Sequence, residues 1–173
     1  LRVVGPVRGR GNVYKRQLAK QMAAGFGYTA KLSIGDRLAA LLRLRVAQIN
    51  PCSYCLILHT RIAVEVGIGA AMVAHLASWR QSTMFSGSEA LALAYCEALT
   101  RYEHEHFDEM HQGLTVFFDE REIAEIAAVV INMNVWTRLK LAQGSVPVVS
   151  PGGEESARDA ERPGVRGKKG NPS

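Results

Sequence analysis

The most constraining feature of this 173-residue sequence is a ten-residue segment, residues 50–59, which reads N-P-C-S-Y-C-L-I-L-H. Asparagine is a preferred helix N-cap, and proline suits the first helical position because its missing N–H needs no partner there. Asn50 and Pro51 therefore predict a helix that begins at Pro51 and runs to about Val66. The apolar residues that follow continue this helical pattern.

This segment carries two cysteines and a histidine in the order C-x-x-C-x-x-x-H. In a helix, Cys52, Cys55 and His59 lie on one stripe, because they are three and four residues apart. Cys52 falls in the first turn, where free N–H groups and the helix dipole stabilise a thiolate. His59 follows Cys55 by four residues, so its imidazole can reach that sulfur. The pattern is typical of a reactive pair of thiols that closes a reversible disulfide.

The rest of the sequence favours an all-α fold, because no segment shows the strict alternation of a strand. We expect one helical-bundle domain over residues 17–143. Besides the motif helix, the predicted helices cover residues 17–26, 33–49, 70–77, 87–103, 106–117 and 119–143. Ser33, Ser86 and Asp119 are the expected N-caps, since each has an acidic residue three positions later.

Several residues outside the motif are expected to be structural. Trp79, Met84 and Phe85 should anchor their loop in the core, and Cys96 should be a small buried core residue and not a resolving thiol. Amide and guanidinium groups near the end of the last helix are expected to make structural hydrogen bonds. The residues expected to make these structural contacts are Asn132, Asn134, Trp136 and Arg138.

The net charge of +5 comes from the ends of the sequence. Residues 1–20 hold six basic residues and no acidic one, and residues 144–173 hold five basic and four acidic residues. The part between them is slightly acidic, so a nucleic-acid-binding face on the folded body is not expected. We expect residues 1–16 to be a basic leader, disordered or non-native, and residues 144–173 to be a disordered tail.

No apolar run is long enough to span a membrane, and three cysteines do not suggest a secreted disulfide framework. A reducing cytoplasm with a redox-active cysteine pair fits this composition better. The acidic and histidine-rich residues 103–111 contain no pair of histidines four residues apart, so they predict an exposed helix end instead of a metal site.

Residues 43–60, R-L-R-V-A-Q-I-N-P-C-S-Y-C-L-I-L-H-T, resemble the carboxymuconolactone decarboxylase-like family and, within it, the alkylhydroperoxidase D-type branch. Three further stretches share the resemblance: H-L-A-S-W-R at 75–80, Phe85-Ser86 before a helix, and I-N-M-N-V-W-T-R-L at 131–139. Together they extend from about residue 32 to 142. The resemblance implies an all-helical, homo-oligomeric peroxidase or thiol oxidoreductase, commonly a trimer or hexamer, with no cofactor or metal.

The resemblance also assigns roles within the motif. It implies that Cys55 is the peroxidatic cysteine, that Cys52 resolves the sulfenic acid, and that His59 transfers the proton. The helix dipole alone would make Cys52 the more acidic thiol, so the two arguments conflict. We follow the resemblance here because His59 is within reach of Cys55. A lipoyl-bearing or thioredoxin-like dithiol protein would reduce the pair after each turnover.

Two positions depart from the pattern of that branch. The branch typically carries a proton-relay glutamate twelve residues before the first cysteine, where this sequence has Ala40, and a histidine before the second cysteine, where it has Tyr54. Gln48 lies near the motif and could hydrogen-bond to His59 or to a water, but it is not a base. The sequence therefore predicts weaker peroxidase activity than a full relay gives, with thiol–disulfide exchange retained.

Other interpretations of the motif remain open. Zinc could bind Cys52, Cys55 and His59, but a fourth ligand is missing nearby. The pair could instead staple the helix in a non-catalytic assembly module, or could be two ordinary core cysteines. Lactone decarboxylation, which the family name suggests, does not rely on this cysteine pair.

Overall fold

The computed structural model describes residues 21, 24–103, 105–142 and 144, and these form helices joined by turns and loops, with no strand. The helices are α2 (Gly35–Ile49), α3 (Ser53–Glu65), α4 (Ala70–His75), the 3-10 helix η1 (Leu76–Gln81), α5 (Gly87–Arg101), α6 (Phe107–Leu114) and α7 (Glu120–Ala142). The all-α prediction is therefore confirmed. The predicted leader, residues 1–16, and all but the first residue of the predicted tail lie outside the described residues.

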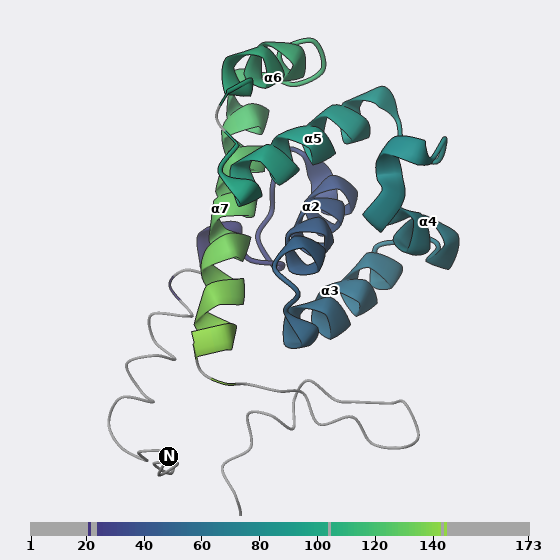
Figure 1. The fold of residues 1–173 in the computed structure, drawn as a ribbon, viewed down its shortest axis with the longest axis vertical. Coiled ribbons are helices and arrows are strands. Elements are labelled where there is room, and N and C mark those ends of the chain that lie inside the picture. The colour runs from purple at the N-terminus through teal and green to yellow at the C-terminus, as the bar shows by residue number, and fades with distance from the viewer. Residues whose placement is uncertain (1–20, 22–23, 104, 143, 145–173) are drawn as a thin grey trace, which may run out of the picture.

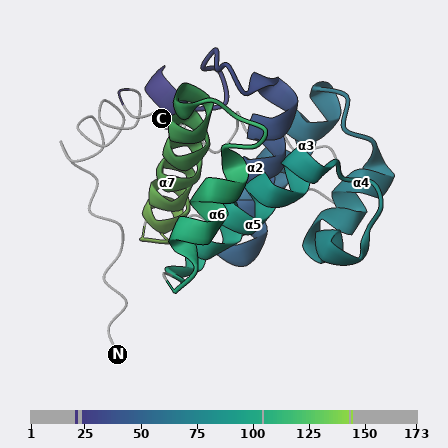
Figure 2. The same cartoon turned by 90° about the horizontal axis from the view of Figure 1, so that it is seen from above.

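Helix α2 lies at the centre of the bundle and packs against α3, α5 and α7 (Figure 1). The long helix α7 runs along one side of it, while α3, α4 and η1 lie on the other side. Figure 2 shows α6 and α5 in front of α2, between these two sides. Helix α2 and the motif helix α3 are joined by the short turn at residues 50–52, so the cysteines lie where the central helix ends.

The central position of α2 follows from its sequence, which is apolar on nearly every face. Every residue from Leu38 to Ala47 is buried, including two arginines. A helix that is hydrophobic all round must be covered on all sides. The periodicity at residues 33–49 predicted only that one face would pack on the motif helix, so the structure shows more burial than that pattern indicated.

The buried Arg45 is neutralised by Glu97 of α5, which is 1% exposed. Arg45 Nε and Nη2 lie 2.7 and 2.6 Å from Glu97 Oε1. The same carboxylate accepts a hydrogen bond from Trp79 Nε1 at 2.9 Å and forms an ion pair with Arg80. Burial would raise the pKa of Glu97, but these hydrogen bonds outweigh it and hold the pKa below its usual value. This network joins α2, η1 and α5.

The start of α2 is closed by a residue that lies far away in the sequence. Glu125 of α7 accepts hydrogen bonds from the backbone N–H groups of Ser33, at 2.6 Å, and Ile34, at 3.2 Å. A carboxylate at this position satisfies free N–H groups and opposes the positive end of the helix dipole. The prediction that Ser33 is the N-cap is therefore wrong: Ile34 holds the N-cap position, without a side-chain cap.

Other predicted features are mostly confirmed. Ser86 and Glu89 form the expected capping box at the start of α5. Asp119 and Glu122 exchange the same pair of bonds before α7, at 3.0 and 2.8 Å. The helix expected over residues 87–103 ends at Arg101, where Tyr102 adopts the left-handed conformation. The helix predicted over residues 106–117 is shorter, because α6 ends at Leu114.

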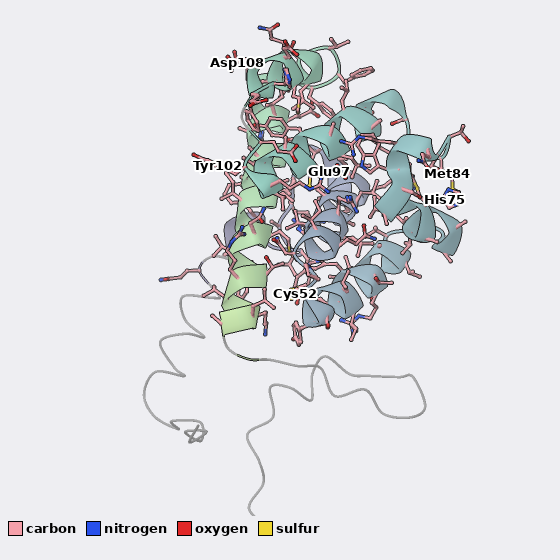
Figure 3. All side chains as sticks on the ribbon, in the orientation of Figure 1. Cys52, His75, Met84, Glu97, Tyr102 and Asp108 are labelled. Carbon is pink, nitrogen blue, oxygen red and sulfur yellow. A yellow bond between two sulfur atoms is a disulfide. The ribbon has the colours of Figure 1, made fainter. Side chains whose placement is uncertain are left out.

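The residues expected to anchor the loop before α5 differ in burial. Trp79 is buried, and Phe85 is partly buried against the same cluster of core residues. Met84, in contrast, is 42% exposed, so its predicted core position is wrong. Figure 3 shows Met84 at the edge of the molecule, close to His75. The helix expected over residues 17–26 is described only at residue 21 and residues 24–26, which are helical.

The Glu97 network predicts a large loss of stability when its charge is removed. In Glu97→Gln, buried Arg45 keeps its charge and loses its counter-ion. We therefore expect the free energy of unfolding to fall by about 3 kcal/mol. Urea unfolding followed by far-UV circular dichroism at pH 7 measures this difference. The matched control is Glu65→Gln, because Glu65 pairs with Arg61 at 3.5 Å on the surface. The control should lose no more than about 0.5 kcal/mol, and equal losses in both variants would contradict the prediction.

Candidate redox site

Cys52 and Cys55 are joined by a disulfide, with their Cα atoms 5.3 Å apart. The bond lies at the start of α3, and Figure 3 shows Cys52 there, between α3 and α7. The sequence predicted that these two sulfurs can bond with little backbone movement, and the structure agrees. The third cysteine, Cys96, is fully buried and lies near the backbone oxygen of Leu42, at 3.7 Å. Burial raises the pKa of Cys96 to about 12, as expected for an inert core thiol.

Helix α3 begins two residues later than predicted, so its N-cap is Cys52 and not Asn50. Cys52 has an extended backbone, and its sulfur accepts a hydrogen bond from the backbone N–H of Cys55 at 3.4 Å. Asn50 is instead the C-cap of α2, where its N–H donates to the backbone oxygen of Val46 at 3.0 Å. The first cysteine therefore takes the place at which a serine or aspartate usually satisfies a free N–H group.

Asn50 has another function in this structure. Its side-chain Nδ2 donates hydrogen bonds to Asn134 Oδ1, at 2.8 Å, and to Thr137 Oγ1, at 3.2 Å. Asn134 in turn donates to Thr100 Oγ1 of α5 at 3.1 Å. These bonds tie the turn before the disulfide to α7, and they confirm the structural contacts predicted for Asn134.

Both sulfur-bearing residues are buried, with Cys52 2% and Cys55 3% exposed. They belong to one apolar cluster with Ala47 of α2 and Met133 of α7. Tyr54, between the two cysteines, carries the ammonium group of Lys140 over its ring at 4.0 Å. The end of α7 therefore packs over the disulfide, and little of either cysteine is exposed.

His59 lies one turn after Cys55 and is 5% exposed. Within the described part of the chain, its buried Nδ1 has no hydrogen-bond partner. Burial and, to a smaller extent, the positive charge of Arg43 together lower the pKa of His59 from 6.5 to about 3. The imidazole is therefore neutral at pH 7.

Arg43 is the buried cation of α2 that acts on His59. Its Nη2 donates hydrogen bonds to the backbone oxygens of Phe26, at 3.1 Å, and Gly27, at 2.8 Å. Burial lowers the pKa of Arg43 to about 10, a shift that the charge of Asp36 partly opposes. Ala40 occupies the position of the relay glutamate. The charged group that acts on His59 is therefore the cation Arg43 and not a carboxylate.

Gln48, suggested as a possible support for His59, hydrogen-bonds to Arg45 of the same helix. Its Oε1 accepts a hydrogen bond from Arg45 Nη1 at 2.9 Å, so it belongs to the Glu97 network. Among the described residues no hydrogen bond joins Gln48 to His59. Likewise, no group of three His, Cys, Asp or Glu side chains in that part of the chain is arranged to hold a metal ion.

The described residues form an all-α bundle with a disulfide at the N-cap of α3. Residues 17–98 match the model of the carboxymuconolactone decarboxylase family. The resemblance seen in the sequence is thereby confirmed. No helix among the described residues is long and apolar enough to cross a membrane.

Two relatives of similar sequence are named as uncharacterized proteins. The chain is 27% identical to the uncharacterized protein YdfG of Bacillus subtilis over 68% of its own length and 81% of the relative. It is 28% identical to the uncharacterized protein YnjA of Escherichia coli over 81% of its own length and 77% of the relative.

Solved structures show the same fold. A protein of unknown function from Agrobacterium tumefaciens, proposed to be the antioxidant defence protein AhpD, aligns with a TM-score of 0.69 at 21% identity. The alignment covers 84% of this chain and 97% of that one. An uncharacterized peroxidase-related protein from Silicibacter sp. TM1040 aligns with a TM-score of 0.71 at 21% identity, over 79% of this chain and 72% of that one.

The lowered pKa of His59 predicts a specific pH dependence of stability. Between pH 6.5 and about 3 the unfolded chain binds a proton at His59 that the folded protein does not, so stability falls as pH falls through this window. At pH 5 the contribution is about 2 kcal/mol relative to pH 7.5. In His59→Gln, the loss of unfolding free energy between pH 7.5 and 5 should shrink by this amount.

Urea unfolding at several pH values measures this difference, and the absolute stability of the variant does not enter the comparison. The control is His111→Gln, because His111 is exposed and should leave the profile unchanged. Parallel profiles for the unmodified chain and His59→Gln would contradict the prediction.

Proposed function

We propose that this protein is a thiol-dependent peroxidase that reduces hydroperoxides through a dithiol–disulfide cycle of Cys52 and Cys55. The observation that carries the proposal is the disulfide between them, formed at the N-cap of a helix with a histidine one turn further on. The name of the peroxidase-related structural neighbour supports the same class of reaction.

In this cycle a thiolate attacks the terminal oxygen of the hydroperoxide and the O–O bond breaks. The attacking cysteine becomes a sulfenic acid, and the alkoxide takes up a proton to leave as an alcohol. The second thiol then attacks the sulfenic sulfur, which forms the disulfide and releases water. A dithiol reductant, for which a lipoyl-bearing or thioredoxin-like protein is the proposed class, restores both thiols and is itself oxidised.

The geometry supports slower peroxide chemistry than a full proton relay gives. His59 is neutral and faces the cation Arg43, so it is a poor acceptor for a thiol proton. Ala40 offers no carboxylate to orient the imidazole. An alternative function, general thiol–disulfide exchange, is favoured by this same observation, because exchange at the disulfide does not need a proton relay to break an O–O bond.

The peroxidase proposal predicts that both motif cysteines are required for turnover. Cys52→Ser and Cys55→Ser should each abolish steady-state consumption of tert-butyl hydroperoxide with reduced lipoamide as electron donor, because neither can form the disulfide. Consumption of peroxide and donor is followed spectroscopically. Cys96→Ala is the control and should retain turnover, because Cys96 is buried and inert.

The outcomes separate the two functions. If the unmodified chain reduces a small disulfide but consumes no hydroperoxide, exchange is the activity and the peroxidase proposal is wrong. If turnover persists in Cys52→Ser or Cys55→Ser, the dithiol cycle itself is wrong.

The cytoplasmic location and the homo-oligomer, a trimer or hexamer, are also proposals that rest on the resemblance. A surface feature supports association: the outer face of α3 bears a shallow, largely apolar groove of about 560 Å³. Ile57 and Val64 are 37% and 56% exposed there, next to the Arg61–Glu65 ion pair. Exposed apolar residues gathered on one helix face are typical of contact surfaces between proteins.

The association proposal predicts that a charge in this groove separates the subunits. Val64→Glu should convert the oligomer to monomers, because an unpaired carboxylate would be buried at the interface. Size-exclusion chromatography with light scattering measures the mass. Val116→Glu is the control, since Val116 is 74% exposed and lies outside the groove. A monomeric unmodified chain, or an unchanged mass for Val64→Glu, would disprove this use of the groove.

A further inference from the structure

The resemblance assigns the first attack to Cys55, but the helix cap singles out the other sulfur. We propose that Cys52 is the thiolate of the reduced pair and the atom that attacks the hydroperoxide, and that Cys55 is the resolving thiol. The peroxide step in this inference rests on the proposed function. The position of the thiolate does not, because it can be measured without any peroxide.

The first support is the hydrogen bond made by the cap. Cys52 holds the N-cap of α3, and its sulfur lies 3.4 Å from the backbone nitrogen of Cys55, the third residue of the helix. An acceptor at the N-cap satisfies one of the free N–H groups of the first turn. A thiolate accepts such a bond more strongly than a thiol does, and the helix dipole adds to this preference. The local geometry therefore favours ionisation at Cys52.

The second support is what surrounds Cys55. Its own N–H is the donor to Cys52, and the nearby group expected to help its sulfur ionise is His59. That imidazole is neutral, since burial and Arg43 lower its pKa to about 3. A neutral imidazole cannot form the thiolate–imidazolium pair that activates a cysteine beside a histidine.

Other charged or titratable groups near the pair do not reverse this assignment. Lys140 of α7 lies over the ring of Tyr54, between the two cysteines, so its charge favours a thiolate on either one. Tyr95 and Cys96 face the same cluster from α5, and burial raises the pKa of both, so they stay neutral. Arg43 of α2 keeps its positive charge, which acts on His59, and its guanidinium is held at the backbone oxygens of Phe26 and Gly27.

The chemistry balances with the roles assigned in this way. The Cys52 thiolate bonds to the terminal peroxide oxygen, the O–O bond breaks, and the departing alkoxide takes a proton to become an alcohol. Cys55 then attacks the sulfenic sulfur of Cys52, which forms the disulfide and releases water. Two thiols are oxidised for each hydroperoxide reduced, and a dithiol compound supplies the two electrons that reset the pair.

The test compares the two thiols by their rates of alkylation as a function of pH. Cys55→Ser/Cys96→Ala leaves Cys52 alone, and Cys52→Ser/Cys96→Ala leaves Cys55 alone. Each reduced variant is treated with iodoacetamide between pH 4 and 10, and intact mass gives the rate. The midpoint in pH is compared because it reports the pKa of each thiol, whereas restricted access to a sulfur lowers its absolute rate without moving the midpoint. We expect the midpoint of Cys52 to lie at least about one pH unit lower, which is about tenfold more thiolate at a given lower pH.

A midpoint for Cys55 equal to or below that of Cys52 would overturn the assignment. The unmodified reduced chain provides a check that needs no substitution: limiting iodoacetamide at pH 6 should label Cys52 first, as located by fragment-ion mass spectrometry. Labelling of Cys55 first would again overturn the assignment.

The substitution His59→Gln separates the two cysteines further, because it should leave the alkylation midpoint of Cys52 unchanged. A rise of about one pH unit in the midpoint of Cys55 alone would show that His59 activates that thiol.

The peroxide step is tested separately with dimedone, which traps sulfenic acids. After one equivalent of tert-butyl hydroperoxide, the variant that retains Cys52 should carry the adduct, and the variant that retains Cys55 should not. An adduct on Cys55 alone would reverse the roles. If neither variant forms an adduct and the unmodified chain forms no disulfide, the proposed peroxidase function fails, while the alkylation midpoints still decide which sulfur is the thiolate.

Discussion

The burial of α2 on every face is the constraint on which the rest of this structure depends. An arginine in such a helix loses its water, so its charge must meet an acceptor inside the protein. Glu97 supplies that acceptor for Arg45, and the backbone oxygens of Phe26 and Gly27 supply it for Arg43. These contacts fix α2 against its neighbours, and the end of α2 in turn fixes the turn that carries the cysteines.

Much of the fold could be predicted because its signals are local. Helical periodicity gave the class, and the acidic residue three positions after Ser86 and Asp119 gave two caps that the structure confirms. The failures have a common cause. The local sequence predicts Ser33 as the cap. In the structure, the backbone N–H of Ser33 itself donates a hydrogen bond to Glu125, which is 92 residues away. A local pattern cannot reveal a partner that only the packed fold brings near.

In the candidate site, too, local features were predictable from the sequence and features that depend on distant residues were not. The cysteine pair and its position at a helix start were predictable from spacing, and the structure joins the two sulfurs. The ionisation of its neighbours was not, because the pKa of His59 depends on burial and on a cation from another helix. The hydrogen bond of Gln48 was not predictable either, because it depends on the side chain of Arg45. The proton chemistry of this motif is therefore set by tertiary structure.

The covering of the disulfide has a kinetic consequence. Asn50 holds the turn against α7, and both sulfurs lie beneath that helix. In the proposed dithiol cycle, a protein-sized electron donor would have to wait for this part of the fold to open, so the opening rate would set an upper limit on the rate at which the disulfide is reduced. At saturating donor, the time constant of the proposed cycle would then be set by the opening of the helical bundle.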